Sequence, residues 1–140
     1  MIATTVGGAR RRIEFVSVAV EPLPGGPQRV RVQLWRRRPT TTSGETFLGS
    51  AEGVDAVHAS AEATLNALRQ ALPDAARIQN VVSVEMLDAL GTTLIGTAIS
   101  AYHGGELRLL LGFCNMRGSE APVAAARAVL DATNRFLGDR

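Results

Sequence analysis

The sequence predicts an α+β fold of two strand-strand-strand-helix units that are related by a pseudo-twofold axis. In this fold a β-sheet packs against two helices. The first observation is the order of elements, because three segments with strand alternation precede a helical segment and the same order then repeats. The second is a match between the two predicted helices at an offset of 65 residues. It gives five identities in a twelve-residue window: Ala61/Ala126, Ala63/Ala128, Leu65/Leu130, Ala67/Ala132 and Leu72/Leu137. In such a duplicated domain, a site is expected where the two halves meet.

The length and composition of the chain fit a single globular domain. Its 140 residues are 46% apolar and 20% charged, so a core can form without disulfides or metals. We predict a mobile N-terminal arm over residues 1–11 and one domain over 12–140, with units of about 12–73 and 74–138. Because a unit of about 65 residues is marginal by itself, each is expected to cover an apolar face of the other.

In the first unit, three strands precede the helix. Ile13–Val20 alternates with the two-residue period of a strand, and the proline- and glycine-rich segment Pro22–Pro27 ends it. Arg29–Trp35 alternates valine and leucine with arginine and glutamine, the pattern of a strand with one wet face. A short third strand, Glu45–Ala51, follows. A helix is then predicted over Asp55–Leu72, with the aspartate as its cap.

The second unit repeats this order. Its strands are predicted over Arg77–Leu87, Thr92–Tyr102 and Glu106–Cys114, and the last two form a hairpin. The closing helix is predicted over about Pro122–Leu137, because proline is tolerated in a first helical turn and Gly138 follows as a stop signal.

The third strand of the second unit is apolar on both sides. Its alternating sets are Leu107, Leu109, Leu111 and Phe113 on one side and Arg108, Leu110, Gly112 and Cys114 on the other. One helix layer covers only one face of a sheet, so the second face is expected to be buried by the other half or by a second copy of the chain. We therefore predict a homodimer, with a position such as Leu110 on the exposed face.

The residue types argue against an enzyme. All 15 basic side chains are arginine, so neither a Schiff-base lysine nor a Walker-type phosphate lysine is present. The two histidines, His58 and His103, have no motif partners. The single cysteine, Cys114, is interpreted as a small hydrophobe at the end of a strand, and it forms no intrachain disulfide or multi-cysteine zinc site. We expect no catalytic residue, no metal and no cofactor.

Nucleic acid and membrane are not the expected partners. Two arginine runs, Arg10–Arg12 and Arg36–Arg38, with Trp35 beside the second, would suit a phosphate backbone and a stacked base. The formal net charge is only +2, however, and arginines at strand ends also protect sheet edges. No apolar stretch reaches the length of a membrane span and no secretory signal opens the chain, so we expect a cytoplasmic protein.

The two strand-to-helix junctions are the best candidates for a site. Residues 49–56 and 112–119 both place glycines and small polar residues before a helix N-terminus. A helix N-terminus offers unpaired N–H groups and a positive dipole end, which suit a carboxylate. As a symmetric pair, the junctions are predicted to form a small-ligand pocket with these candidate binding residues: Gly49, Gly53, Asp55, Gly112, Gly118 and Ser119.

Three stretches of the chain match sequence patterns of a known domain. Residues 49–56 are similar to a Gly-x-Gly-x-Gly-Pro-Val-Asp-Ala junction, residues 77–92 to a second-unit opening strand and turn, and residues 126–137 to a closing Leu-Asn-Ala-Leu-Asn-Arg helix. These patterns belong to the C-terminal regulatory, or allosteric dimerisation, domain of 2-isopropylmalate synthase and its citramalate synthase relatives, which the chain resembles. The resemblance implies two such units, a dimer and an amino-acid-like ligand. It carries no synthase activity, because the catalytic barrel is absent.

These observations favour a non-catalytic, dimeric regulatory module that senses a small carboxylate-bearing metabolite. The ligand would bind one arrangement of the halves or subunits better than another and shift the population accordingly. An assembly module without a ligand accounts for the repeat and the apolar second face equally well. An arginine-mediated nucleic-acid-binding protein is the third hypothesis, and an enzyme the least supported.

Overall fold

The computed structural model of the chain describes residues 13–38, 43–72 and 77–138, with side chains as far as Phe136. The arm predicted over residues 1–11 and the arginine run at 10–12 lie outside the described residues. Within them the predicted fold class is confirmed: the chain is an α+β structure of two strand-strand-strand-helix units.

Each unit contributes one three-stranded antiparallel sheet. The first unit comprises β1 (Glu14–Pro22), β2 (Gln28–Arg37), β3 (Gly44–Gly53) and α2 (Ala56–Ala71). The second comprises β4 (Ile78–Ala89), β5 (Thr92–His103), β6 (Glu106–Asn115) and α3 (Ala121–Gly138). The strand orders are β1-β2-β3 and β4-β5-β6, and we call these sheets A and B.

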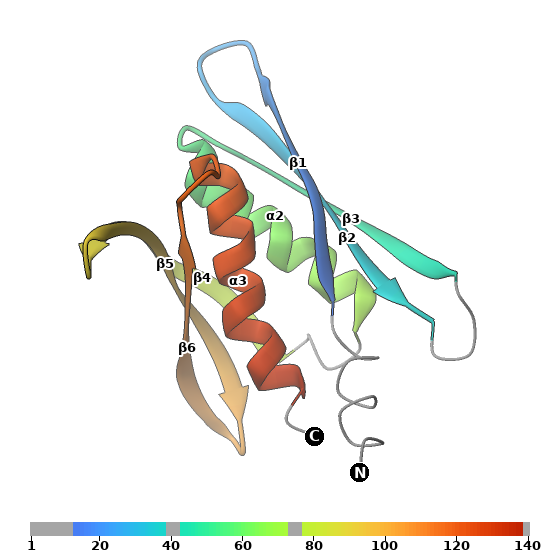
Figure 1. Cartoon of the computed structure of the whole chain (residues 1–140). Helices are drawn as coiled ribbons and strands as arrows, with labels where there is room; N and C mark the ends of the chain where they lie inside the picture. The colour runs from blue at the N-terminus through green and yellow to red at the C-terminus, as the bar shows by residue number, and fades with distance from the viewer. Residues whose placement is uncertain (1–12, 39–42, 73–76, 139–140) are drawn as a thin grey trace.

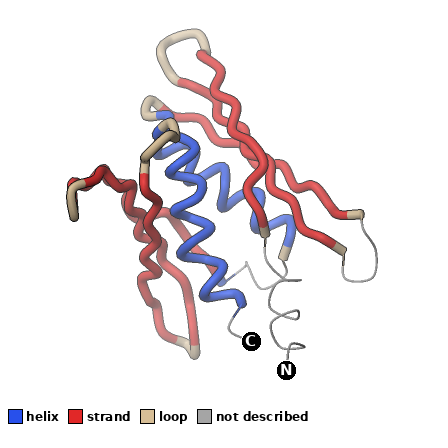
Figure 2. The backbone as a smooth tube through the Cα atoms, in the orientation of Figure 1, coloured by secondary structure: helices blue, strands red, loops and turns tan. Residues whose placement is uncertain are grey.

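The two helices lie between the two sheets (Figures 1 and 2). α2 packs on β2 and β3 and also reaches β4, whereas α3 packs on β5 and β6 and also reaches β1. The helices contact each other as well. Each sheet therefore has an inner face, which the helices cover, and an outer face on which neither α2 nor α3 lies.

One core cluster joins the two units. The inner face of β2 supplies Val30, Val32 and Leu34, all without exposed surface, as the alternation of this strand predicts. The same cluster contains Ile99 of β5 and Val129 of α3. Because apolar side chains of both units share this cluster, each unit covers apolar surface of the other, as expected for units too small to be stable alone.

Two glycines allow the helices to approach the sheets closely. Gly49 of β3 and Gly112 of β6 are buried, and a Cβ atom added to either would overlap helix backbone. The nearest helix residues are Ala63 and Ala67 over Gly49, and Ala128 and Ala132 over Gly112. Both alanine pairs belong to the helix match at an offset of 65, so the two units repeat the same glycine-to-alanine contact.

Several strands run further than the sequence predicts. β3 continues to Gly53, which pairs with Gln28 of β2, and β4 continues to Ala89. The ladder of β4 and β5 persists because a two-residue turn, Leu90 and Gly91, joins the strands directly, and both turn residues have positive φ. The predicted strand ends at Ala51 and Leu87 were therefore too early.

The glycine contact gives a stability prediction. Gly49→Ala and Gly112→Ala should each lower the free energy of unfolding by about 2 kcal/mol or more, because the added methyl group would force helix and sheet apart. Denaturant titration followed by circular dichroism measures this change.

Gly53→Ala is the matched control. Gly53 also lies in β3, its backbone is not in the left-handed region, and an added Cβ would meet only the Ala59 side chain at 3.9 Å. We expect a change within about 0.5 kcal/mol there. Equal losses at Gly49 and Gly53 would show that close helix packing is not the reason for glycine.

Candidate functional site

The residues of the first junction divide between packing and capping. Gly49 lies within β3 beneath α2, so the helix contact accounts for glycine there. Gly53 is the last residue of that strand. Asp55 is the N-cap of α2, and its carboxylate accepts a hydrogen bond of 2.9 Å from the N–H of Val57. The predicted capping role of Asp55 is confirmed.

The residues of the second junction form a turn before α3. Gly118 has a φ of 70°, in the left-handed region that glycine favours. The N–H of Ser119 donates to the carbonyl of Met116 at 2.9 Å, and the Ser119 hydroxyl lies 3.3 Å from the guanidinium of Arg127, which donates to it. Gly112, the remaining candidate, lies earlier, in β6 beneath α3.

The fold brings the N-terminal turns of the two helices together. The hydroxyl of Ser60 in α2 donates a hydrogen bond of 2.6 Å to the carbonyl of Pro122 in the first turn of α3. Val57 and Met116 pack here against a buried cluster of Ile95 and alanines of α3. The positive ends of both helix dipoles therefore lie at the same end of the molecule.

The histidines do not meet. His58 lies 3.5 Å from the carboxylate of Glu62 on the same helix, whereas the His103 ring packs edge-on against the Phe136 ring at 5.9 Å between centroids. The described residues contain no group of three His, Cys, Asp or Glu side chains that could hold a metal ion. In the same part of the chain, neither helix has the length and apolar character needed to cross a membrane.

The second arginine run is largely occupied by contacts within the protein. The Arg36 guanidinium donates to the carbonyl of Ala71 at 2.9 Å and to the carboxylate of Glu45 at 3.0 Å. Arg37 lies over the Trp35 ring at 5.5 Å. These contacts leave less of the run available for phosphate groups than the sequence alone suggests.

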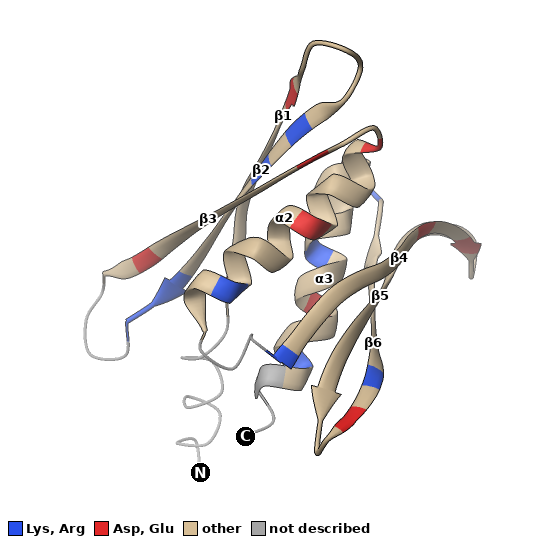
Figure 3. Cartoon of the chain, turned by 180° about the vertical axis from the view of Figure 1, so that it is seen from behind, with Lys and Arg blue, Asp and Glu red and all other residues tan. Residues whose placement is uncertain are grey.

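The outer face of sheet A carries cross-strand ion pairs, as the alternation of β2 predicts, and Leu48 of β3 is also exposed on it. Arg29 of β2 pairs with Glu52 of β3 at 2.9 Å, and Arg31 pairs with Glu21 of β1 at 3.4 Å. Figure 3 shows these charges along the strands of sheet A, whereas β6 carries charge only near its start. Sheet A can therefore face water without a partner.

The outer face of sheet B is apolar and exposed along β6, and by the strand register it also includes Asn80 and Ser83 of β4. Four alternate side chains of β6 lie on it, with these exposed fractions: Leu107 60%, Leu109 60%, Leu111 52% and Phe113 46%. The strand register places Tyr102 of β5 and Leu87 of β4 on the same face. By the same register, Glu85 is the only charged side chain on this face among the described residues of sheet B.

Of the two ways in which the second face was expected to be buried, the structure excludes one. The described part of the other half does not cover it, because α2 and α3 lie on the inner faces of the sheets. The expectation that Leu110 is exposed is wrong, because this residue lies half-buried on the inner face and packs against the core. The second apolar face of the strand is the one formed by the odd-numbered residues.

Side chains of α3 protect the free edge of β6. The Asp131 carboxylate accepts a hydrogen bond of 3.0 Å from the N–H of Phe113, and the Arg135 guanidinium donates to the carbonyl of Leu111 at 2.7 Å. Unit 1 has a related contact, because the side-chain amide of Asn66 donates to the carbonyl of Ser50 at 2.9 Å. These polar contacts occupy backbone groups that would otherwise pair with another strand.

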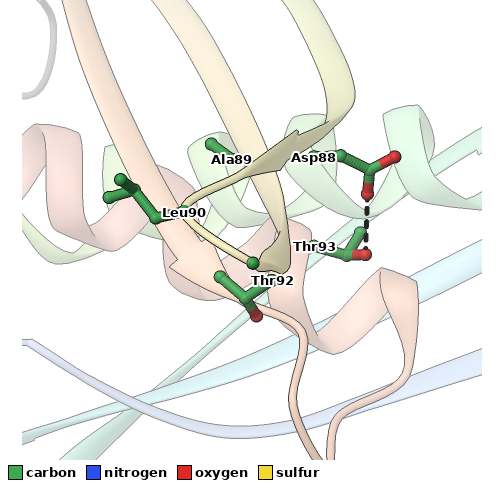
Figure 4. A pocket seen from close by; sticks show the side chains of 6 residues that line it. Asp88, Ala89, Leu90, Thr92 and Thr93 are labelled. Atoms are coloured by element: carbon green, nitrogen blue, oxygen red, sulfur yellow. Dashed lines mark hydrogen bonds between the residues drawn. The ribbon is translucent and has the colours of Figure 1, made fainter.

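A shallow hollow of about 320 Å³ lies at the β4–β5 turn, lined by residues 88–93 (Figure 4). The side chains of Asp88 and Thr93 close one side with a hydrogen bond of 2.9 Å, and Leu90 points away from them. Because six consecutive residues of one hairpin form the whole lining, the hollow is the concave side of the turn rather than a pocket between elements.

Comparison of the sequence with models of known protein families finds no matching family, and comparison with curated proteins finds no match.

Sequence reasoning placed a turn at Gly91, but it missed the edge contacts and the two-residue length of that turn with its exposed leucine. Asn66 and Asp131 occupy the same place in the helix match, and both contact an edge strand. The sequence signal for these edge contacts was a pair of polar residues at matching positions among identical alanines and leucines. For the turn, the signal was Leu90-Gly91 between two alternating segments, a spacing typical of a two-residue hairpin.

Burial makes the single cysteine a poor nucleophile. It raises the pKa of the Cys114 thiol, and the Asp131 carboxylate adds to this rise while the nearby Arg127 opposes it. The protonated thiol is therefore favoured in the folded protein. The corresponding contribution to stability is present at neutral pH and is lost as the pH rises through the folded-state pKa.

We expect iodoacetamide to alkylate Cys114 more slowly in the folded protein than in the urea-unfolded chain near pH 8, because less thiolate is present. Rates measured from pH 7 to 10 by mass spectrometry should show the folded profile displaced to higher pH. Equal rates in both states would contradict a buried, non-catalytic thiol.

Proposed function

We propose that this protein is a non-catalytic, dimeric assembly module in which the outer face of sheet B meets the same face of a second copy. The observation that carries the proposal is the row of four half-exposed apolar side chains on β6: Leu107, Leu109, Leu111 and Phe113. Monomeric proteins rarely expose a continuous apolar patch of this kind, and such patches mark interaction sites.

The contact is proposed to form face to face rather than edge to edge. Strand addition at β6 would require its free N–H and C=O groups, and Asp131 and Arg135 already engage those of Phe113 and Leu111. The apolar side chains of the outer face project perpendicular to the sheet and carry no such block. Packing of two faces would bury all four from both copies.

A second copy is the partner that this composition favours. Interfaces between identical subunits are more apolar than interfaces between separately soluble partners. Within the described strands, the outer face of sheet B has a single charged side chain, Glu85, which lies on the edge strand β4. A twofold contact between copies sets apolar side chains against each other without requiring charge complementarity.

The repeat provides a matched pair of variants for the test. Leu111→Arg should abolish association, because each dimer would bury two arginines without partners, and the dissociation constant should rise by about a thousandfold or more. Leu48 occupies the corresponding place on sheet A, one residue before Gly49, with a similar exposed fraction of 60%. Leu48→Arg should leave association unchanged.

Sedimentation equilibrium over a concentration series measures both variants beside the unmodified chain, and circular dichroism checks that each is folded. A chain that remains monomeric at concentrations well above micromolar would overturn the proposal. So would equal effects of the two arginine substitutions.

We propose regulation by a small carboxylate as the second candidate function. The observation in its favour is the hydrogen bond between Ser60 and Pro122, which holds the N-terminal turns of both helices together, so two positive dipole ends could act on one anion. The resemblance to an allosteric amino-acid-binding domain suggests branched-chain amino acids and their keto acids as ligands. The candidate binding residues that lie beside the helix N-termini are Gly53, Asp55, Gly118 and Ser119, whereas Gly49 and Gly112 lie beneath the helices.

A thermal-shift screen of these acids tests the regulatory proposal. At a concentration of about one hundred times the dissociation constant, a ligand stabilises the folded state by about 2.7 kcal/mol, which raises the melting temperature by several degrees. The branched-chain amine that lacks the carboxylate serves as the control and should cause no shift. If no acid shifts the melting temperature, or if the amine acts equally, the carboxylate site is contradicted.

A further inference from the structure

The turn between β4 and β5 presents a leucine in an unfavourable setting. Leu90 is 100% exposed and has a φ of 56°. Among the described residues, it is the only residue other than glycine that has a positive φ. Asparagine, aspartate or glycine is the usual residue at the first position of such a two-residue turn, because a leucine side chain is strained there. Conformation and solvation therefore both disfavour leucine here in a monomer.

The hairpin that carries Leu90 is held in place rather than loose. Its strands pair as far as Ala89 and Thr92, immediately beside the turn. The Thr92 hydroxyl donates to the side-chain oxygen of Asn115 at 3.1 Å, and the N–H of Met116 donates to the carbonyl of Thr93 at 3.0 Å. The leucine is thus presented at a defined place relative to β6, which lowers the entropic cost of docking it.

The hairpin continues the apolar surface of sheet B. Leu87 of β4 and Phe113 of β6 both lie over Gly96, so the outer face runs without a gap from β6 across β5 to β4. The end of the hairpin curls away from the helices, which places it on the outer side of sheet B (Figures 1 and 3).

We propose that the β4–β5 hairpin is a docking arm, whose Leu90 packs against the second copy at the far end of that copy's outer face, beside Leu107 and Tyr102. This inference rests on the proposed dimer and names the element that fixes its orientation. Two hairpins that both curl toward the partner would collide if the stacked sheets ran in the same direction. In the antiparallel arrangement each arm extends past the β5–β6 end of the partner sheet, where Leu107 is exposed.

Leu90→Asn tests the arm because it should act in opposite directions on folding and on association. Asparagine suits the turn, so the melting temperature of a Leu111→Arg monomer should rise when Leu90→Asn is added. The dissociation constant of the otherwise unmodified dimer should increase by about tenfold or more, because two leucines are lost per dimer. Val54→Asn, which removes an exposed apolar side chain from the loop between β3 and α2, should leave association unchanged.

The outcomes separate this inference from the dimer itself. If the unmodified chain is monomeric, both proposals fail. If Leu111→Arg dissociates the dimer but Leu90→Asn associates like the unmodified chain, the outer face is the interface and the docking arm is overturned.

A cross-linking experiment checks the orientation. With an added oxidant such as oxidised glutathione, two Cys114→Ala chains, one carrying Leu90→Cys and the other Leu107→Cys, should form a mixed disulfide dimer faster than either chain cross-links with itself. Faster self-linking of the Leu90→Cys chain would contradict the antiparallel arrangement.

Discussion

A single layer of two helices has to serve two sheets, and this constraint shapes the rest of the molecule. The helices fit between the sheets because alanines face buried glycines, Gly49 in β3 and Gly112 in β6, at both contacts. The helices thereby cover the inner faces of both sheets and neither outer face. Each outer face must then be tolerant of water or acquire a partner, since apolar surface left in water is unfavourable.

The two halves meet this requirement in different ways. Sheet A carries cross-strand ion pairs, among them Arg29 with Glu52, on its outer face, whereas sheet B carries leucines and Phe113 there. The polar contact between a helix and the edge strand is retained in both halves, through Asn66 and Asp131. The two units therefore share the helix packing and the edge contact but differ in the outer face, which is why we assign association to sheet B.

The fold was largely predictable because its signals are local. Alternation in β2 and the alanine-rich helix match indicated two repeated units, and capping chemistry identified Asp55. The site was less predictable because it depends on contacts between distant residues. Glycine at 49 and 112 suggested ligand junctions, but the helix above each position decides its packing role. The two-sided apolarity of β6 was readable, whereas the face that the helices leave free required the fold, which is why Leu110 was placed wrongly.

The central claim is that the outer face of sheet B is buried in a dimer. Hydroxyl-radical footprinting across a dilution series tests it directly, because the oxidation of each side chain reports its access to solvent. We predict that Leu109, Leu111 and Phe113 become protected as the concentration rises, while Leu48 and Val54 stay reactive throughout. Oxidation of the β6 side chains that does not change with concentration would contradict the account.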